Sequence, residues 1–106
     1  MTFLGGIEAG GTKFVCAVGS GPGQIESIET FPTTNPAQTL DRAVEFFQKS
    51  SSPMDAIGIA SFGPIDLHKS SRAYGRITTT PKPGWQNVDI VGRIGSALGL
   101  PVAFDT

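Results

Sequence analysis

Three segments near the start of the chain have the patterns of strands: the first two are apolar runs, and in the third polar and apolar residues alternate. These segments cover residues 3–9, 12–18 and 24–31. The pair Gly10 and Gly11 separates the first two, and a glycine-rich turn at residues 19–23 separates the second from the third. Apolar and alternating runs of this length are typical of strands, and a glycine pair between two of them is typical of a hairpin. The pattern therefore predicts a three-stranded antiparallel meander.

The spacing of apolar residues changes to that of a helix after the proline-containing break at residues 32–36. A helix is predicted over residues 37–49, where an apolar residue recurs at every third or fourth position: Ala37, Leu40, Val44 and Phe47. Either Thr34 or Asn35 is placed to cap its first turn.

Two short apolar runs, residues 55–60 and 101–104, are predicted to be buried strands. Between them a second helix is predicted over residues 89–98, with Gly99 at its end. Its inward face is expected to consist of Val91, Ile94 and Leu98. The resulting order, βββαβαβ, predicts an α/β domain with a mixed five-stranded sheet flanked by helices.

Composition narrows the class of protein. A length of 106 residues suits one domain, and a net charge of −1 without a basic cluster argues against a nucleic-acid partner. No apolar run approaches the length that crosses a membrane, and residues 2–7 do not resemble a secretion signal.

The single cysteine, Cys16, lies in an apolar strand pattern. We therefore expect a buried structural thiol in a cytoplasmic protein.

The tip of the first hairpin carries groups that suit a polyphosphate. Gly10 and Gly11 let backbone amides approach an anion, Thr12 adds a hydroxyl, and Lys13 adds a positive charge. Glu8, at the end of the first strand, is placed to hold a metal-bound water near those phosphates. An ordinary hairpin turn explains the same residues without a ligand. The spacing matches neither a Walker A loop nor a dinucleotide-binding loop.

Two later loops are candidates for the wall of a site. Residues 61–64 follow a predicted strand, and ligands of open α/β sheets gather at the carboxyl ends of strands, although a plain turn is the alternative. In the loop at residues 77–85, Thr80, Lys82 and Trp85 supply hydroxyl, charge and aromatic surface, which suits a sugar. For Trp85 itself, packing onto the core is the favoured explanation.

Four motifs together resemble the N-terminal part of ROK-family sugar kinases, and among these the bacterial fructokinases most. They are Glu-Ala-Gly-Gly-Thr-Lys at 8–13, Ser-Phe-Gly-Pro-Ile-Asp at 61–66, Tyr-Gly-Arg-Ile-Thr-Thr-Thr-Pro-Lys-Pro-Gly-Trp at 74–85, and Pro-Val-Ala-Phe-Asp-Thr at 101–106. The resemblance implies a ribonuclease-H-like, actin-like ATPase fold in which two such domains close over ATP, Mg²⁺ and a hexose. Residues 1–106 would then be the N-terminal domain.

The resemblance also implies roles for individual residues. The phosphates of ATP and its Mg²⁺ are expected at Glu8, Gly10, Gly11, Thr12 and Lys13, with Glu8 acting on the metal indirectly. The sugar is expected at Gly63, Pro64, Thr80, Lys82 and Thr106.

This sequence departs from the family pattern at three places. Most members have aspartate at the position of Glu8, and related glucokinases have asparagine near that of Lys82. The general-base aspartate is expected immediately after Thr106, so no catalytic residue is assigned within the chain. Asp105 matches an acidic residue two positions before that base and is not assigned as the base. The adenosine-binding loop and a zinc-binding cysteine cluster are implied to lie further on.

The function implied for the parent protein is ATP-dependent phosphorylation of D-fructose to fructose 6-phosphate, with the fragment alone inactive. A glucokinase or another hexose kinase of the family is the alternative, followed by a sugar-responsive ROK transcription regulator and a non-catalytic binding module. The parent protein is expected to be a homodimer. In the isolated chain, the uncovered inner face of the domain is expected to expose apolar surface and to cause self-association.

Overall fold

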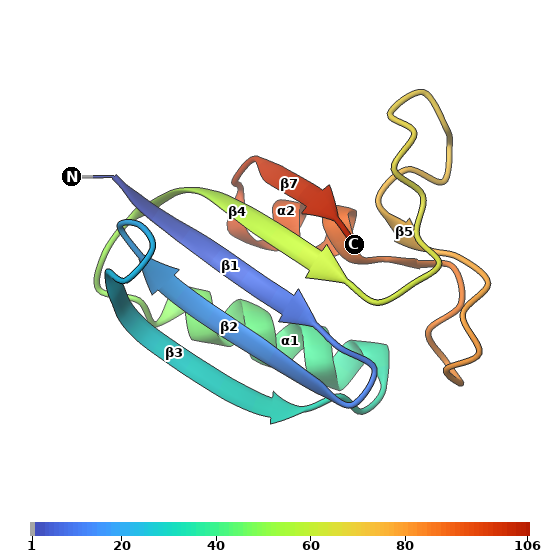
Figure 1. The fold of residues 1–106 in the computed structure, drawn as a ribbon, viewed down its shortest axis with the longest axis horizontal. Helices are drawn as coiled ribbons and strands as arrows, with labels where there is room; N and C mark the ends of the chain where they lie inside the picture. Colours follow the sequence, from blue (N-terminus) through green and yellow to red (C-terminus); the bar gives the residue numbers. More distant parts are fainter. Residues whose placement is uncertain (1) are drawn as a thin grey trace.

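Residues 2–106, which the computed structural model describes, form a five-stranded sheet with two helices on one of its faces (Figure 1). The strands lie in the order β3-β2-β1-β4-β7. Their bounds are Phe3–Ala9 for β1, Lys13–Gly19 for β2, Ile25–Pro32 for β3, Met54–Ser61 for β4 and Val102–Asp105 for β7. β1, β2 and β3 pair antiparallel, whereas β4 runs parallel to both β1 and β7. The predicted mixed sheet and its antiparallel meander are therefore confirmed.

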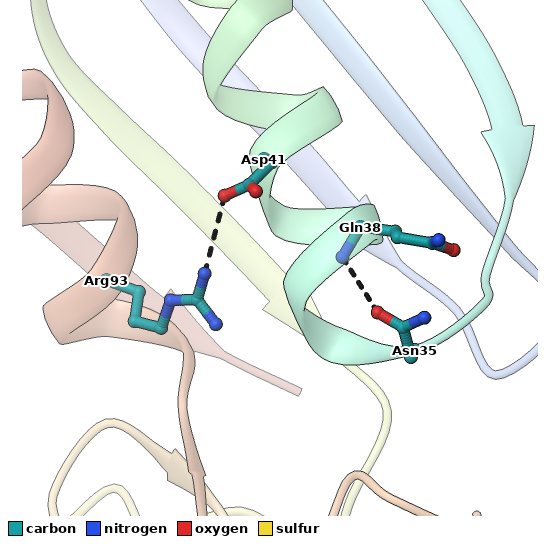
Figure 2. Close-up of polar contacts among 4 residues, drawn as sticks. All are labelled: Asn35, Gln38, Asp41 and Arg93. Carbon is teal, nitrogen blue, oxygen red and sulfur yellow. Dashed lines mark hydrogen bonds and ion pairs between the residues drawn. The ribbon is translucent and has the colours of Figure 1, made fainter.

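Both helices begin at a side-chain cap. In α1 (Pro36–Gln48), Asn35 Oδ1 accepts a hydrogen bond of 2.8 Å from the backbone N–H of Gln38, as Figure 2 shows. In α2 (Ile90–Leu98), Asp89 accepts in the same way from Gly92, and Gly99 ends the helix in the left-handed conformation with φ of 65°. Because capping satisfies otherwise unpaired amides, each cap stabilises its helix by about 1 kcal/mol.

The buried face of α1 differs from the predicted one. Ala37 is exposed and Val44 only half-buried, while the fully buried residues of the helix are Thr39, Leu40, Ala43 and Phe47. Thr39 can be buried because its Oγ1 accepts a 2.9 Å hydrogen bond from the backbone N–H of Thr34. A pattern based on apolar residues alone cannot find such a position. In α2, Ile94 is buried as predicted, Val91 and Leu98 are half-buried, and Ile90 is buried in addition.

A small second sheet, which the sequence did not predict, lies between β4 and α2. It pairs β5 (Arg76–Ile77) with β6 (Val88–Asp89) antiparallel. Of these four residues, Ile77 falls in the loop predicted at residues 77–85, and Asp89 in the predicted second helix. Strands of two residues are too short for a period of two to appear, which explains the omission.

Trp85 is fully buried beneath the loop that carries it. Its ring lies 5.8 Å from the ring of Phe14 in β2 and 5.7 Å from that of Phe62, which follows β4 (centroid distances). The indole N–H donates a 2.8 Å hydrogen bond to the backbone carbonyl of Thr34. The packing explanation for Trp85 is therefore confirmed, and the indole joins three segments that are distant in sequence.

The face of the sheet opposite the helices is open. A shallow groove runs across it, and its floor consists largely of small residues from four strands: Gly6, Ala17, Gly58, Ala60 and Ala103. On the same face of the sheet, Leu4 is 48% and Ile28 61% exposed. Exposed aliphatic side chains beside an uncovered sheet are typical of a surface that another element covers.

We expect the 106-residue chain to bind an apolar fluorescent dye and to form oligomers in sedimentation experiments. The double variant Leu4→Thr/Ile28→Thr should reduce both effects and change the free energy of unfolding by no more than about 1 kcal/mol, because both side chains are exposed. Leu67→Thr is the matched control, since Leu67 is 40% exposed but lies in the loop after β4. A monomeric wild type without dye binding contradicts the expectation.

Cys16 is fully buried on the helix-covered face of β2, as predicted. Burial, and to a smaller extent the negative charge of Glu29 on β3, raises the pKa of its thiol from 9.0 to about 12. Between these two values the unfolded chain releases the proton while the folded chain keeps it. The folded state consequently loses stability as the pH rises through this range.

Relative to the variant Cys16→Ala, we expect the wild type to lose about 1.4 kcal/mol of unfolding free energy per pH unit above pH 9. Urea unfolding of both proteins at several pH values measures this difference. The same pH dependence in both proteins would show that the thiol does not titrate as its burial requires.

Candidate active site

The residues singled out from the sequence gather at one edge of the sheet. The carboxyl ends of the parallel strands β1, β4 and β7 meet there, together with the tip of the β1–β2 hairpin (Figure 1). The segment between β4 and α2, yellow to orange in Figure 1, extends from the same edge. This edge carries Glu8, Gly10, Gly11, Thr12, Lys13, Gly63, Pro64, Thr80, Lys82, Asp105 and Thr106.

The hairpin tip is a tight turn. The backbone N–H of Gly10 donates a 2.9 Å hydrogen bond to the carbonyl of Lys13, which leaves Gly11 and Thr12 as the connecting residues. A Cβ atom at position 10 would lie 2.7 Å from the Lys13 carbonyl oxygen, so a side chain does not fit there. The glycine is required by this close approach.

In the tip, two carbonyls are paired and two amides are not. Thr33 donates a hydrogen bond from its Oγ1 to the carbonyl of Gly10 at 2.7 Å, and another from its N–H to the carbonyl of Thr12 at 2.8 Å. Within residues 2–106, no protein acceptor pairs with the N–H of Gly11 or Thr12. Two unpaired amides at an exposed tip are donors for an anion.

The positive charges at the tip also lack partners. Among the residues that the structure describes, neither Lys13 nor Lys82 has a carboxylate within 4.0 Å. Lys82 lies against the tip, because its Cδ is 4.0 Å from the position of a Cβ built on Gly11. The loop assigned to the sugar therefore lies next to the hairpin assigned to the phosphates.

Hydrogen bonds connect the two loops that follow β4. Thr78 donates to the carbonyl of Pro64 from its N–H at 2.8 Å and from its Oγ1 at 3.1 Å. Thr80 is 1% exposed, and its Oγ1 accepts a 3.2 Å hydrogen bond from the backbone N–H of Lys82. In this structure the Thr80 hydroxyl shapes the loop, and its direct contact with a sugar stays a prediction.

The segment at residues 61–64 is joined to its neighbours in the same way. The N–H of Phe62 donates a 2.8 Å hydrogen bond to the carbonyl of Ala9, and the Phe62 ring packs edge-on against Trp85. A plain turn was the alternative for this segment if no other loop converged on it. Because two other segments do converge there, the geometry favours the wall of a site.

Two carboxylates stand at the same level of the open face. Glu8 pairs with Ala60 across β1 and β4, and Ala60 pairs with Asp105 across β4 and β7. Two strand spacings place the Cα atoms of Glu8 and Asp105 about 10 Å apart, and both residues line the groove. Sequence reasoning did not pair these residues, because the register of parallel strands is not readable from the chain.

The donor set suits a hydrated hard cation better than a directly bound one. Residues 2–106 contain no group of three histidine, cysteine or acidic side chains that could enclose a metal ion. Magnesium is usually held by one or two carboxylates, by water and by substrate phosphates. An exposed Glu8 beside the unpaired amides of the hairpin tip fits that pattern. No helix in the described part of the chain is long and apolar enough to cross a membrane.

Comparison with curated proteins gives close relatives. The fructokinase of Streptococcus mutans is 51% identical over 102 residues, which cover 96% of this chain and 35% of that protein. The chain thus spans about a third of the length of the curated relative.

Solved structures share the fold. The ROK hexokinase of Thermus thermophilus superposes with a TM-score of 0.79 at 25% identity, covering 98% of this chain and 35% of that one. A ROK family glucokinase from Streptomyces griseus, in complex with glucose and AMPPNP, has a TM-score of 0.75 at 22% identity over 97% of this chain and 32% of that one. Residues 4–106 match the sequence profile of the ROK family. On this match, which spans nearly the whole sequence, the chain belongs to the ROK family.

Proposed function

We propose that the parent protein transfers the γ-phosphoryl group of ATP to O6 of D-fructose, and that residues 1–106 are its N-terminal domain. The observation that carries this proposal is the hairpin tip, where two unpaired amides and Lys13 adjoin Lys82. Lys82 belongs to the loop at residues 77–85, which we call the sugar-side loop. The 51% identity to a fructokinase supports fructose as the acceptor. The shared fold of a glucokinase that binds glucose and AMPPNP, an analogue of ATP, supports ATP as the donor.

In this proposal the hairpin tip binds the terminal phosphates. The amides of Gly11 and Thr12, the Thr12 hydroxyl and the Lys13 ammonium donate to phosphate oxygens, and Gly10 permits the tight turn. Glu8 orients a water molecule of the hydrated Mg²⁺. When bound, the metal neutralises charge on the phosphates. Placement and charge stabilisation of this kind account for most of the catalysis of phosphoryl transfer.

The sugar is proposed to bind against Gly63, Pro64, Thr80, Lys82 and Thr106. The hydrogen bonds from Thr78 to the carbonyl of Pro64 hold the sugar-side loop against residues 61–64 before the sugar binds. The hydrogen bond from Lys82 to Thr80 fixes the shape of the sugar-side loop itself. The aspartate expected immediately after Thr106 takes the proton from O6. The O6 oxygen then forms a bond to the γ-phosphorus, while the bond from that phosphorus to the leaving oxygen of ADP breaks.

Further parts of the proposal concern the whole protein. We propose a cytoplasmic homodimer, with adenosine-binding and zinc-binding segments outside the present sequence. Related glucokinases have asparagine near the position of Lys82, and a lysine there supports the fructokinase assignment.

The proposal is tested with the full-length protein and a panel of fructose, glucose and mannose, with MgATP as donor. We expect kcat/KM for fructose to exceed the values for the other two sugars by at least about tenfold. Preference for glucose would instead identify the glucokinase alternative. Absence of phosphorylation with every sugar would contradict the kinase assignment.

A matched pair of variants checks that the activity arises at this edge of the sheet. Glu8→Gln should lower kcat/KM for MgATP by at least about tenfold, because the charge that orders the hydrated ion is lost. Asp55→Asn is the control, since Asp55 is exposed near the opposite end of β4. Equal activity of the two variants would show that Glu8 has no role in the active site.

A further inference from the structure

We propose that Lys82 acts on the phosphoryl group: its ammonium binds oxygens of the terminal phosphate held at the hairpin tip. The sugar-side loop would thereby position the phosphoryl donor and the sugar that accepts the phosphoryl group together. The part of this inference that concerns a hexose rests on the proposed function, whereas the binding of phosphate at the tip does not.

The side chain of Lys82 already lies in position for this contact. Lys82 is half-buried, and its Cδ is 4.0 Å from the position that a Cβ built on Gly11 would occupy, so the distal part of its side chain lies beside the tip. A phosphate oxygen accepting from the N–H of Gly11 would lie about 2.9 Å from that nitrogen. The Lys82 ammonium is two bonds beyond Cδ and reaches the same anion.

The backbone of Lys82 is fixed relative to the tip. Its N–H donates to Thr80 Oγ1 at 3.2 Å, and its carbonyl accepts from the N–H of Trp85 at 3.2 Å. The Trp85 indole is bonded to the carbonyl of Thr34. Thr33, the preceding residue, donates hydrogen bonds to the carbonyls of Gly10 and Thr12 in the tip. Lys82 and the tip are thus anchored to the same short segment.

The charges present at the tip match a polyphosphate better than a sugar. Over the described part of the chain, Lys13 and Lys82 lack carboxylate partners, and the amides of Gly11 and Thr12 lack acceptors. Four donors, two of them charged, suit an anion that carries several negative charges. A neutral sugar hydroxyl is a weaker acceptor for an ammonium than a phosphate oxygen is.

The role of Lys82 in the transfer is electrostatic. As the bond from O6 to phosphorus forms, the electron pair of the breaking bond stays on the leaving oxygen of ADP, and the O6 proton goes to the expected aspartate. Lys82 keeps its own proton throughout and stabilises the negative charge on the phosphoryl oxygens. It is therefore a catalytic residue in this proposal, since it touches the reacting group.

The first test uses the 106-residue chain and inorganic tripolyphosphate, with binding followed by NMR at the amides of Gly11 and Thr12. We expect Lys82→Met to weaken binding by about tenfold and Lys82→Arg to retain most of it. The exposed Lys69 supplies the matched control, because Lys69→Met removes the same charge away from the tip and should weaken binding less than about twofold. Unchanged binding in Lys82→Met, or no shift of either amide in the wild type, overturns the inference.

The second test separates phosphate from sugar in the full-length enzyme. Lys82→Met should lower kcat by at least about tenfold, with the KM for fructose changed less than about threefold. A raised KM for fructose with unchanged kcat would assign Lys82 to the sugar and overturn the inference. A wild type that binds tripolyphosphate at the tip but phosphorylates no hexose refutes the proposed function alone, and the NMR comparison then decides the role of Lys82.

Discussion

The buried indole of Trp85 holds together the segments that form the candidate active site. Its ring packs between Phe14 of β2 and Phe62 after β4, and its N–H is bonded to the carbonyl of Thr34. Burial of the large aromatic ring supplies much of the free energy that attaches the loop to the sheet, while the single hydrogen bond fixes the orientation of the ring. The loop that carries Trp85 is therefore attached to the sheet at a defined position.

The attachment of this loop also places the hydrogen-bond donors at the edge of the sheet. Residues 33–34 bond to Trp85 on one side and to the carbonyls of the hairpin tip on the other. This arrangement leaves two amides of the tip unpaired and brings Lys82 beside Gly11 before any ligand binds. Donors that are held in place do not have to be ordered during the reaction, which is the physical basis of catalysis by positioning. Membership of the ROK family accords with such a site.

Much of this structure could be predicted from the sequence, because apolar runs, helical spacing and glycine turns specify the meander, the helices and the order of the elements along the chain. The rule that ligands gather at the carboxyl ends of strands also marked residues 61–64 as a candidate wall of a site, whereas the sugar-binding roles of Gly63 and Thr106 came from the family resemblance. What could not be predicted depends on contacts between distant residues. Burial of Thr39 requires a hydrogen bond from Thr34, and the pairing of Glu8 with Asp105 requires the register across Ala60. The path of the 77–85 loop, which brings Lys82 to the tip, depends on where Trp85 is buried.

Amide hydrogen exchange in the variant Trp85→Phe measures whether Trp85 couples the sugar-side loop to the hairpin tip. Removing the indole N–H should accelerate exchange at Gly10 and Thr33, whose amides close the tip, by about tenfold relative to Ile59 in the interior strand β4. Phe47→Leu, a core change beneath α1, serves as the control and should affect all three amides alike. Acceleration confined to residues 80–88, with Gly10 and Thr33 unchanged relative to Ile59, would contradict this coupling.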